Sequence, residues 1–366
     1  MTNRRMHDGQ EVPSSVNSLL QCLHRLPNKA QLIRAISRIT TAYLRDPEPW
    51  VVGYSGGKDS TAVVKLVFQS LIRLKGPRKR VTIIYCDTGV EIPLASELAK
   101  KALGELEIEA QSFAVPISVK ILSPPIAERF WVKVIGRGYP PPTDKFRWCT
   151  DRLRIDPVSK FLESENIRSA TVVLGVREAE SPTRSLTLSE NRTHDPFWRT
   201  QKGDRSRRLF MPILDYSLSD VWHANLTLDL PHSLRAEEVA ELYASASGEC
   251  PTLRDVKSAP CGKARFGCWT CTVAKNGTTL RNLIAGGHVN LQPLLEFRLW
   301  LEDSRYAAQF RRKRRRNGAP GLGPMTLPWR RLALKRLLDV QERSRLQLIT
   351  ADELDAIEVH WKAYDA

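Results

Sequence analysis

A glycine-containing loop between an apolar run and a helical segment constrains the fold of this chain more than any other feature. The apolar run 50–54 leads into the loop 55–60, Ser-Gly-Gly-Lys-Asp-Ser, and residues 60–74 then carry apolar side chains at helical spacing. A second apolar run, 81–86, is followed by a helical pattern over 94–106. Strands that alternate with helices predict an α/β fold, a parallel sheet with helices on both faces.

The remaining segments extend this pattern and then depart from it. We expect a helix over 31–46, strands over 108–114 and 170–174, and a helix over 159–165. The polar stretch 181–208 is interpreted as a mobile loop over a site. The 366 residues are divided into an N-terminal arm over 1–30, an α/β domain over 31–235, a cysteine module over 236–290 and a basic helical C-terminal region over 291–366.

The loop 55–60 has the chemistry of a phosphate-binding site. Its glycines let the backbone approach an anion closely, and the helix that follows presents unpaired N–H groups. Asp87, at the end of the second strand, is placed where ligands of parallel sheets bind. An ordinary glycine turn and a strand-ending turn are the alternatives for these two features. The expected ligands of ATP and Mg²⁺ are Ser55, Gly56, Gly57, Lys58, Asp59, Ser60 and Asp87.

Arginines are concentrated in two segments around the predicted strand 170–174. Guanidinium groups bind phosphate or sulfate bidentately, so these side chains are expected to hold a substrate anion. A thiol between arginines should have a lowered pKa and favour the thiolate, although Cys149 can also be a small buried residue. A solvated loop is the alternative for the second segment. The candidates are Arg147, Arg152, Arg154, Arg177 and Arg184, and the expected catalytic residues are Lys58, Asp59, Cys149 and Arg177.

Four of the seven cysteines lie close together late in the chain, with the spacing Cys-x10-Cys-x6-Cys-x2-Cys. Thiolates bind zinc tetrahedrally or hold an iron–sulfur cluster, and the spacing leaves both open beside free buried thiols. An odd number of cysteines in a chain without an export signal does not suggest disulfides. The expected metal ligands are Cys250, Cys261, Cys268 and Cys271.

The chain resembles the phosphoadenosine phosphosulfate reductase family of the ATP pyrophosphatase superfamily. The resemblance rests on the loop 55–60, the Arg-Trp-Cys-Thr-Asp-Arg-Leu-Arg segment 147–154, Gly-Val-Arg at 175–177 and the stretch 212–222, in the family's order. It implies an adenine nucleotide alpha hydrolase-like fold and an enzyme that cleaves ATP between the α and β phosphates. The Glu-Cys-Gly-x-His-type motif of true reductases is not found, which argues against sulfonucleotide reduction.

The cysteine block 261–273 and the stretch 314–327 resemble the DndC-type sulfurtransferases of DNA phosphorothioation, or the related SspD type. This resemblance implies a [4Fe-4S] cluster on the four cysteines. It implies transfer of AMP to a DNA backbone phosphate, followed by replacement of an oxygen by sulfur. DNA, a cysteine desulfurase as sulfur donor and other phosphorothioation proteins are the implied partners. The alternatives are a related enzyme acting on a small sulfonucleotide or on tRNA, and a zinc-containing DNA-binding module without catalysis.

The charge of the chain favours an anionic partner. There are 56 Lys and Arg residues against 40 Asp and Glu residues, a net charge of +16, and six consecutive cations occupy 311–316. Such a run requires DNA phosphates or another anion, or else remains a solvated run. No segment approaches about 18 uninterrupted apolar residues, and no secretory signal is evident, so we expect a cytoplasmic protein without membrane association.

Overall fold

The computed structural model describes residues 29–74, 79–143, 145–180, 194–201, 204–247, 266–273 and 277–365. Most of the expected N-terminal arm, Arg184, Cys250 and Cys261 lie outside these ranges. None of the helices within the described ranges is long and apolar enough to cross a membrane.

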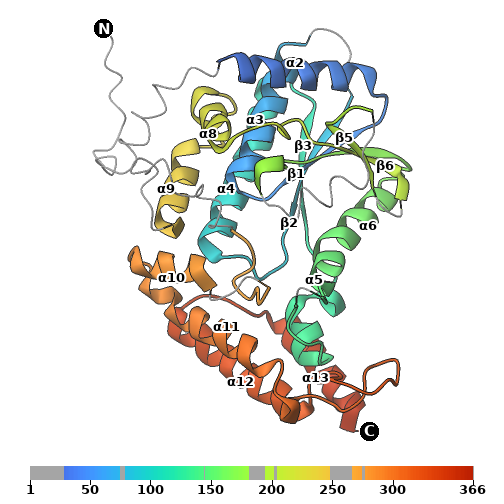
Figure 1. Cartoon of the computed structure of the whole chain (residues 1–366), viewed down its shortest axis with the longest axis vertical. Helices are drawn as coiled ribbons and strands as arrows, with labels where there is room; N and C mark the ends of the chain where they lie inside the picture. The colour runs from blue at the N-terminus through green and yellow to red at the C-terminus, as the bar shows by residue number, and fades with distance from the viewer. Residues whose placement is uncertain are drawn as a thin grey trace.

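A six-stranded sheet forms the upper part of the molecule in Figure 1. Its order is β3-β2-β1-β4-β6-β5, and all neighbours are parallel except the β5–β6 pair at one edge. The predicted α/β fold with a parallel sheet is therefore confirmed. The strands are β1 (Trp50–Tyr54), β2 (Val81–Cys86), β3 (Ile117–Leu122), β4 (Ala170–Val173), β5 (Trp198–Gln201) and β6 (Asp204–Phe210).

Helices cover both faces of this sheet, as predicted. Side chains such as Val52 and Ile83 pack in one core with α2 (Lys29–Arg45), α3 (Lys58–Ile72), α4 (Pro93–Ser112) and α8 (Leu218–Thr227). The opposite face is covered by α6 (Asp156–Ser164), where Val51 and Ile84 contact Phe161 and Leu162. The two faces are thus closed by helices from different parts of the chain (Figure 1).

Two sequence-based expectations about this sheet are wrong. Residues 108–114 are not a strand, because the helix α4 runs through them to Ser112 and β3 begins at Ile117. Leu103, Leu106 and Ala110 are buried at helical spacing, whereas Ile108 is 71% exposed. The stretch 181–208, taken as a loop, contains β5 and most of β6. Its polar composition is tolerated because β5 is an edge strand that pairs on one side only.

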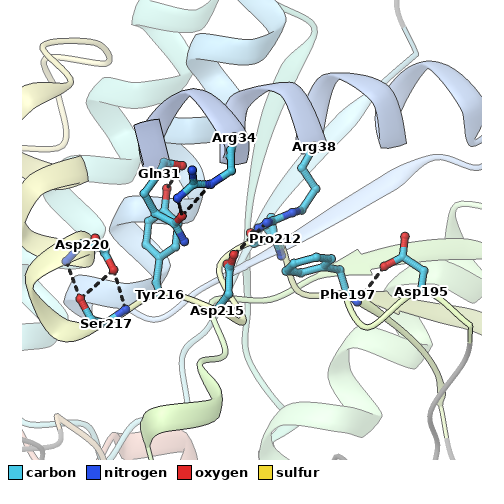
Figure 2. Close-up of polar contacts among 10 residues, drawn as sticks. All are labelled: Gln31, Arg34, Arg38, Asp195, Phe197, Pro212, Asp215, Tyr216, Ser217 and Asp220. Carbon is cyan, nitrogen blue, oxygen red and sulfur yellow. Dashed lines mark hydrogen bonds and ion pairs between the residues drawn. The ribbon is translucent and has the colours of Figure 1, made fainter. Parts of the chain in front are cut away.

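A polar network ties α2 to the segment that follows β6 (Figure 2). The Arg38 guanidinium bonds to both carboxylate oxygens of Asp215 at 2.9 and 3.0 Å, and lies 3.4 Å from the ring centroid of Phe197. The Ser217 side chain accepts from the Asp220 N–H at 3.2 Å, while Asp220 accepts from the Ser217 N–H at 2.8 Å. This capping box starts α8.

The C-terminal helices pack below the sheet and share a second core with the segment after β3 (Figure 1). The indole N–H of Trp131 donates to the Leu348 carbonyl at 2.8 Å, and that of Trp361 donates to the Ile135 carbonyl at 3.0 Å. Residues 126–155 are therefore the link between the sheet and the C-terminal region. The helices are α5 (Trp148–Thr150), α9 (Ala236–Ser247), α10 (Thr278–Ala285), α11 (Gln292–Ser304), α12 (Leu327–Ser344) and α13 (Ala351–Asp365), with π-helical turns at Val132–Gly136 and Asp151–Ile155.

Candidate nucleotide and sulfur site

The loop 55–60 joins β1 to α3 and is closed by its own hydroxyl groups. The Ser60 hydroxyl donates to the Gly57 carbonyl at 2.9 Å, and the Ser55 N–H donates to the Ser60 oxygen at 3.1 Å. Gly56 has φ +72°, and a Cβ atom there would lie 2.8 Å from the Cβ of Ala99. The sharp turn therefore requires glycine, and it brings the N-terminus of α3 to the surface of a cavity.

Lys58 and Arg177 meet on the carboxylate of Asp59. The Lys58 ammonium lies 2.9 Å from one oxygen of Asp59, and the Arg177 Nε–H donates to the other oxygen. Lys58 and Arg177 are buried, and the ammonium also faces the ring of Tyr243 at 4.8 Å. One carboxylate between two cations leaves a net positive charge, so this triad can still attract phosphate oxygens.

A cavity of about 620 Å³, here called the loop cavity, opens in front of this triad. Gly175 stands at its wall, where a Cβ atom would lie 2.8 Å from the carbonyl of Asp59 and 2.9 Å from the nitrogen of Ser60. The volume is in the range of sites that hold one small molecule or nucleotide. Its further lining includes Tyr54, Ile84, Cys86, Glu91, Arg154, Val172, Leu174, Arg207, Tyr243 and Phe266.

Asp87 does not line the loop cavity. Its carboxylate forms an ion pair with Lys100 at 2.7 Å and accepts from the Gly89 N–H at 3.1 Å. It lines an adjoining cavity of about 360 Å³ instead. Glu91 lines both cavities, and burial raises the pKa of its carboxyl group. The carboxylate that follows β2 into the loop cavity is thus Glu91, four residues beyond the expected one.

The arginine segment after residue 146 is divided between two sites. Arg154 lines the loop cavity, where its guanidinium lies 3.8 Å from Glu91 and interacts electrostatically with the nearby Cys268. Arg147 and Arg152 line a separate, larger groove toward the C-terminal region. Arg177, in contrast, contacts the loop 55–60. These side chains therefore do not converge on one anion, because the helical turn 148–155 turns them to opposite sides.

The Cys268–Cys271 turn lies at the rim of the loop cavity. Cys268 pairs with Glu91 in an antiparallel bridge, in which the Trp269 N–H donates to the Val90 carbonyl at 2.9 Å. The Cys271 N–H donates to the Cys268 carbonyl at 3.0 Å, a turn that places two thiols close together. These two residues fit half of a thiolate ligand set, and the other two expected ligands lie outside the described ranges. The described residues alone contain no group of three metal ligands.

The expected thiolate at Cys149 is not supported. Burial raises the pKa of Cys149, with a further contribution from neighbouring Cys271, and the flanking arginines do not reverse this effect. Burial also raises the pKa of Cys86 to about 11 and that of Cys268 to about 12. Desolvation outweighs the cations here because Arg147 and Arg152 face the other site. Cys149 lies near Cys271, beside the loop cavity but not in its lining.

Several residues that line or support the loop cavity were not predicted from the sequence. Arg207 comes from the stretch assigned to a loop, and Tyr243 comes from α9, assigned to the cysteine module. Asn225, whose amide donates to the Lys58 carbonyl at 2.9 Å, holds the start of α3 in place. Of these residues near the cavity, only Gly175 could have been found from the sequence, because a glycine directly after a buried strand often marks a close approach of two backbone segments.

Comparison with known proteins gives the family. The model of the phosphoadenosine phosphosulfate reductase domain matches residues 49–274, more than half of the chain. The chain belongs to the phosphoadenosine phosphosulfate reductase family. This membership confirms the expected family and the expectation of an enzyme of the ATP pyrophosphatase type. The match spans β1, the loop 55–60 and the Cys268–Cys271 turn.

Other similarities of this reductase-family chain are distant. An uncharacterized protein of Methanocaldococcus jannaschii is 26% identical over 188 residues, which cover 51% of this chain and 33% of that protein. Among solved structures, the phosphoadenylyl-sulfate reductase of Candida auris has a TM-score of 0.36 at 12% identity, over 59% of this chain and 86% of that one. The U34-tRNA thiolase of Methanococcus maripaludis has a TM-score of 0.36 at 13% identity, over 75% and 81%. Neither structural similarity carries an inference about function.

Proposed function

We propose that this chain is an ATP-dependent sulfurtransferase that adenylates a DNA backbone phosphate and replaces a non-bridging oxygen with sulfur. The observation that supports this most is the position of the Cys268–Cys271 turn, which pairs with Glu91 in the lining of the cavity that the loop 55–60 also lines. An activated phosphate and a sulfur-carrying group are the two components that such a transfer requires. The resemblance to DndC-type proteins supplies DNA as the substrate.

The first chemical step belongs to the triad of Lys58, Asp59 and Arg177, of which Lys58 and Asp59 line the loop cavity. A non-bridging oxygen of the DNA phosphate attacks the α-phosphorus of ATP, and pyrophosphate leaves. Lys58, Arg177 and the N–H groups at the start of α3 neutralise the charge that develops on the leaving group. Asp59 is suited to orient both cations and to bind Mg²⁺ together with the ATP phosphates.

The second step releases AMP. A hydrosulfide attacks the DNA phosphorus, the P–O bond to AMP breaks, and AMP leaves with the original oxygen. With hydrosulfide as the sulfur donor, no electrons are exchanged. With a persulfide from a cysteine desulfurase as the donor, a second thiol must supply two electrons, and it becomes part of a disulfide. Cys250, Cys261, Cys268 and Cys271 would hold a [4Fe-4S] cluster, with one thiolate on each iron, and the chemistry that it would supply is electron transfer.

The product of ATP cleavage tests this proposal. The protein, purified without oxygen, is expected to convert ATP to AMP and pyrophosphate, with faster turnover when DNA is added. Lys58→Gln should lower the rate at least about 100-fold because it removes one charge from the phosphate site. Lys335→Gln, a change at an exposed lysine on α12, serves as the control. Formation of ADP would contradict the proposal, and stimulation by tRNA but not by DNA would favour the tRNA-thiolating alternative.

Metal analysis tests the sulfur half separately. Iron and acid-labile sulfide near four atoms each per chain, with absorbance near about 400 nm, are expected. Cys268→Ser and Cys271→Ser should each lower both contents, whereas Cys86→Ser, at a thiol in the loop cavity, should not. A colourless protein with one zinc ion would contradict the cluster and support a structural metal site.

A further inference from the structure

A second cavity system lies between the C-terminal region and the segment 137–152. It consists of a cavity of about 1410 Å³ and an adjoining one of about 670 Å³, which share Arg315, Arg316 and Pro324. We call the two together the basic groove. Sites for one small molecule usually measure about 300–1,000 Å³, so the basic groove is large enough for a longer ligand.

The cations of the basic groove are presented by a paired loop. Residues 311–325 fold back on themselves through bridges between Arg311 and Met325 and between Arg314 and Pro320. The Met325 N–H donates to the Gly138 carbonyl at 2.8 Å, which fastens this loop to the segment after β3. The six consecutive cations are therefore held in a defined place on the surface and do not form a free tail.

Backbone carbonyls hold these guanidinium groups without neutralising them. Arg311 donates to the carbonyls of Arg305 and Leu322 at 2.7 and 3.0 Å, and Arg316 donates to the Arg137 carbonyl at 2.9 Å. A carbonyl is uncharged, so each guanidinium keeps its positive charge. The smaller cavity is lined by Arg137, Arg312, Lys313, Arg314, Arg315, Arg316 and Arg330 beside Gly, Pro and Met residues. Such a surface attracts a polyanion.

Aromatic side chains stand in the same groove. Phe146 is 45% exposed and Tyr306 is 57% exposed, and both line the larger cavity. Arg305 lies 4.6 Å from the ring of Tyr306, and Arg316 lies 4.0 Å from the ring of Tyr139. Aromatic faces interleaved with cations are the arrangement that binds single-stranded nucleic acids, where bases stack and phosphates pair with arginine.

The basic groove and the loop cavity meet at one helical segment. Thr150, Asp151 and Arg152 line the groove, whereas Arg154 and Ile155 line the loop cavity. A ligand in the groove therefore lies against one side of the segment whose other side lines the loop cavity. A double helix presents its bases stacked inside, and would leave Phe146 and Tyr306 without partners, which favours an unpaired strand.

We infer that the basic groove binds a single-stranded stretch of nucleic acid, with bases on Phe146 and Tyr306 and phosphates on the loop 311–316. This inference rests on the proposed function, because it explains how a backbone phosphate is brought toward the loop cavity. The ligand chemistry, unpaired bases on a phosphodiester chain, is common to DNA and RNA.

Fluorescence anisotropy of the full chain with labelled 16-nucleotide DNA, RNA and duplex DNA tests this inference. Single strands are expected to bind at least about 10-fold more tightly than the duplex. Phe146→Ala/Tyr306→Ala should weaken single-strand binding about 10- to 100-fold and duplex binding less than about twofold. Arg315→Ala/Arg316→Ala should weaken both. Two controls are matched: Lys101→Ala/Lys362→Ala removes two exposed charges elsewhere, and Ile108→Ala trims a distant exposed apolar side chain.

The outcomes separate the groove from the chemistry. Tighter binding of the duplex, or equal losses in groove and control variants, would overturn the inference even if AMP is formed. If the chain binds single-stranded RNA more tightly than single-stranded DNA, and the groove variants weaken this binding, the inference about the basic groove is supported and RNA is identified as its ligand. ATP cleavage without nucleic acid should change less than about twofold in all groove variants, since none of these residues lines the loop cavity. If the wild-type chain forms no AMP but binds single strands in the basic groove, the proposed function is wrong and the inference about the groove remains supported.

Discussion

At the scale of single residues, the contact between Gly175 and the loop 55–60 is the most sensitive point of the site. A methyl group on Gly175 would lie 2.8 Å from the Asp59 carbonyl, a distance that Cβ atoms do not adopt. Gly175→Ala is therefore expected to displace the loop and to lower AMP formation at least about 10-fold. Gly104→Ala is the control, because its Cβ atom meets nothing within 4 Å in α4 and should stabilise the helix by about 0.5–1 kcal/mol. Equal activities of the two variants would show that the loop adapts.

Lys65 is a second residue with a measurable effect. It is buried in α3, its ammonium donates to the carbonyls of Asn225 and Leu228, and burial lowers its pKa from 10.5 to about 8. Between these two pH values only the unfolded chain keeps the proton, so stability rises with pH. Relative to Lys65→Met, the wild-type free energy of unfolding should increase by about 2 kcal/mol from pH 8 to pH 10. Urea unfolding at both pH values measures this difference, and parallel curves would contradict it.

At the scale of elements, the paired loop 311–325 depends on one close approach. The backbone of Gly323 lies so close to Arg314 that a Cβ atom would stand 1.8 Å from the Arg314 carbonyl oxygen. Gly323→Ala should separate the two halves of the loop and weaken binding of single-stranded DNA at least about 10-fold. ATP cleavage without nucleic acid should stay within about twofold, because the loop cavity lies on the other side of residues 148–155. A loss of both activities would mean that the element also supports the sheet.

At the scale of the whole molecule, the charge of +16 predicts a strong dependence of DNA binding on salt. If the basic groove contacts about six phosphates of a single strand, the dissociation constant should rise about 300-fold between 50 and 200 mM salt. The rate of ATP cleavage without DNA should hardly change with the salt concentration. Anisotropy titrations at four salt concentrations give the slope, and a slope near zero would argue against phosphate contacts.

The sequence predicted the sheet and the loop 55–60 well, because both depend on local patterns. Apolar runs such as 50–54 and 81–86 are buried strands, and the glycine turn lies between β1 and α3 as expected. The strand predicted at 108–114 is wrong because the burial of Leu106 and Ala110 on one face of a helix outweighs the β-propensity of Ile108 and Phe113. The π-helical turn 151–155 alters the direction of successive side chains, so the division of the arginines between two sites had no sequence signal.

The residues that complete the site were harder to predict because they arrive through tertiary packing. Tyr243 and Arg207 reach the loop cavity from α9 and β6, far along the chain from the loop 55–60. Cys149 shows the same limit for electrostatics: neighbouring arginines in sequence suggest a thiolate, whereas burial dominates in three dimensions. The surroundings of a side chain in the site depend on residues that are distant in sequence, and local sequence patterns do not show which residues these are.

The backbone pairing of Glu91 with Cys268 makes the rim of the loop cavity and the sulfur-bearing turn one mechanical unit. A shift of the connection between β2 and α4 when a nucleotide arrives would drag the thiols along with it. Anyone who transplants either segment into a homologous scaffold must therefore move the other as well, since the backbone bridge between them would otherwise be lost.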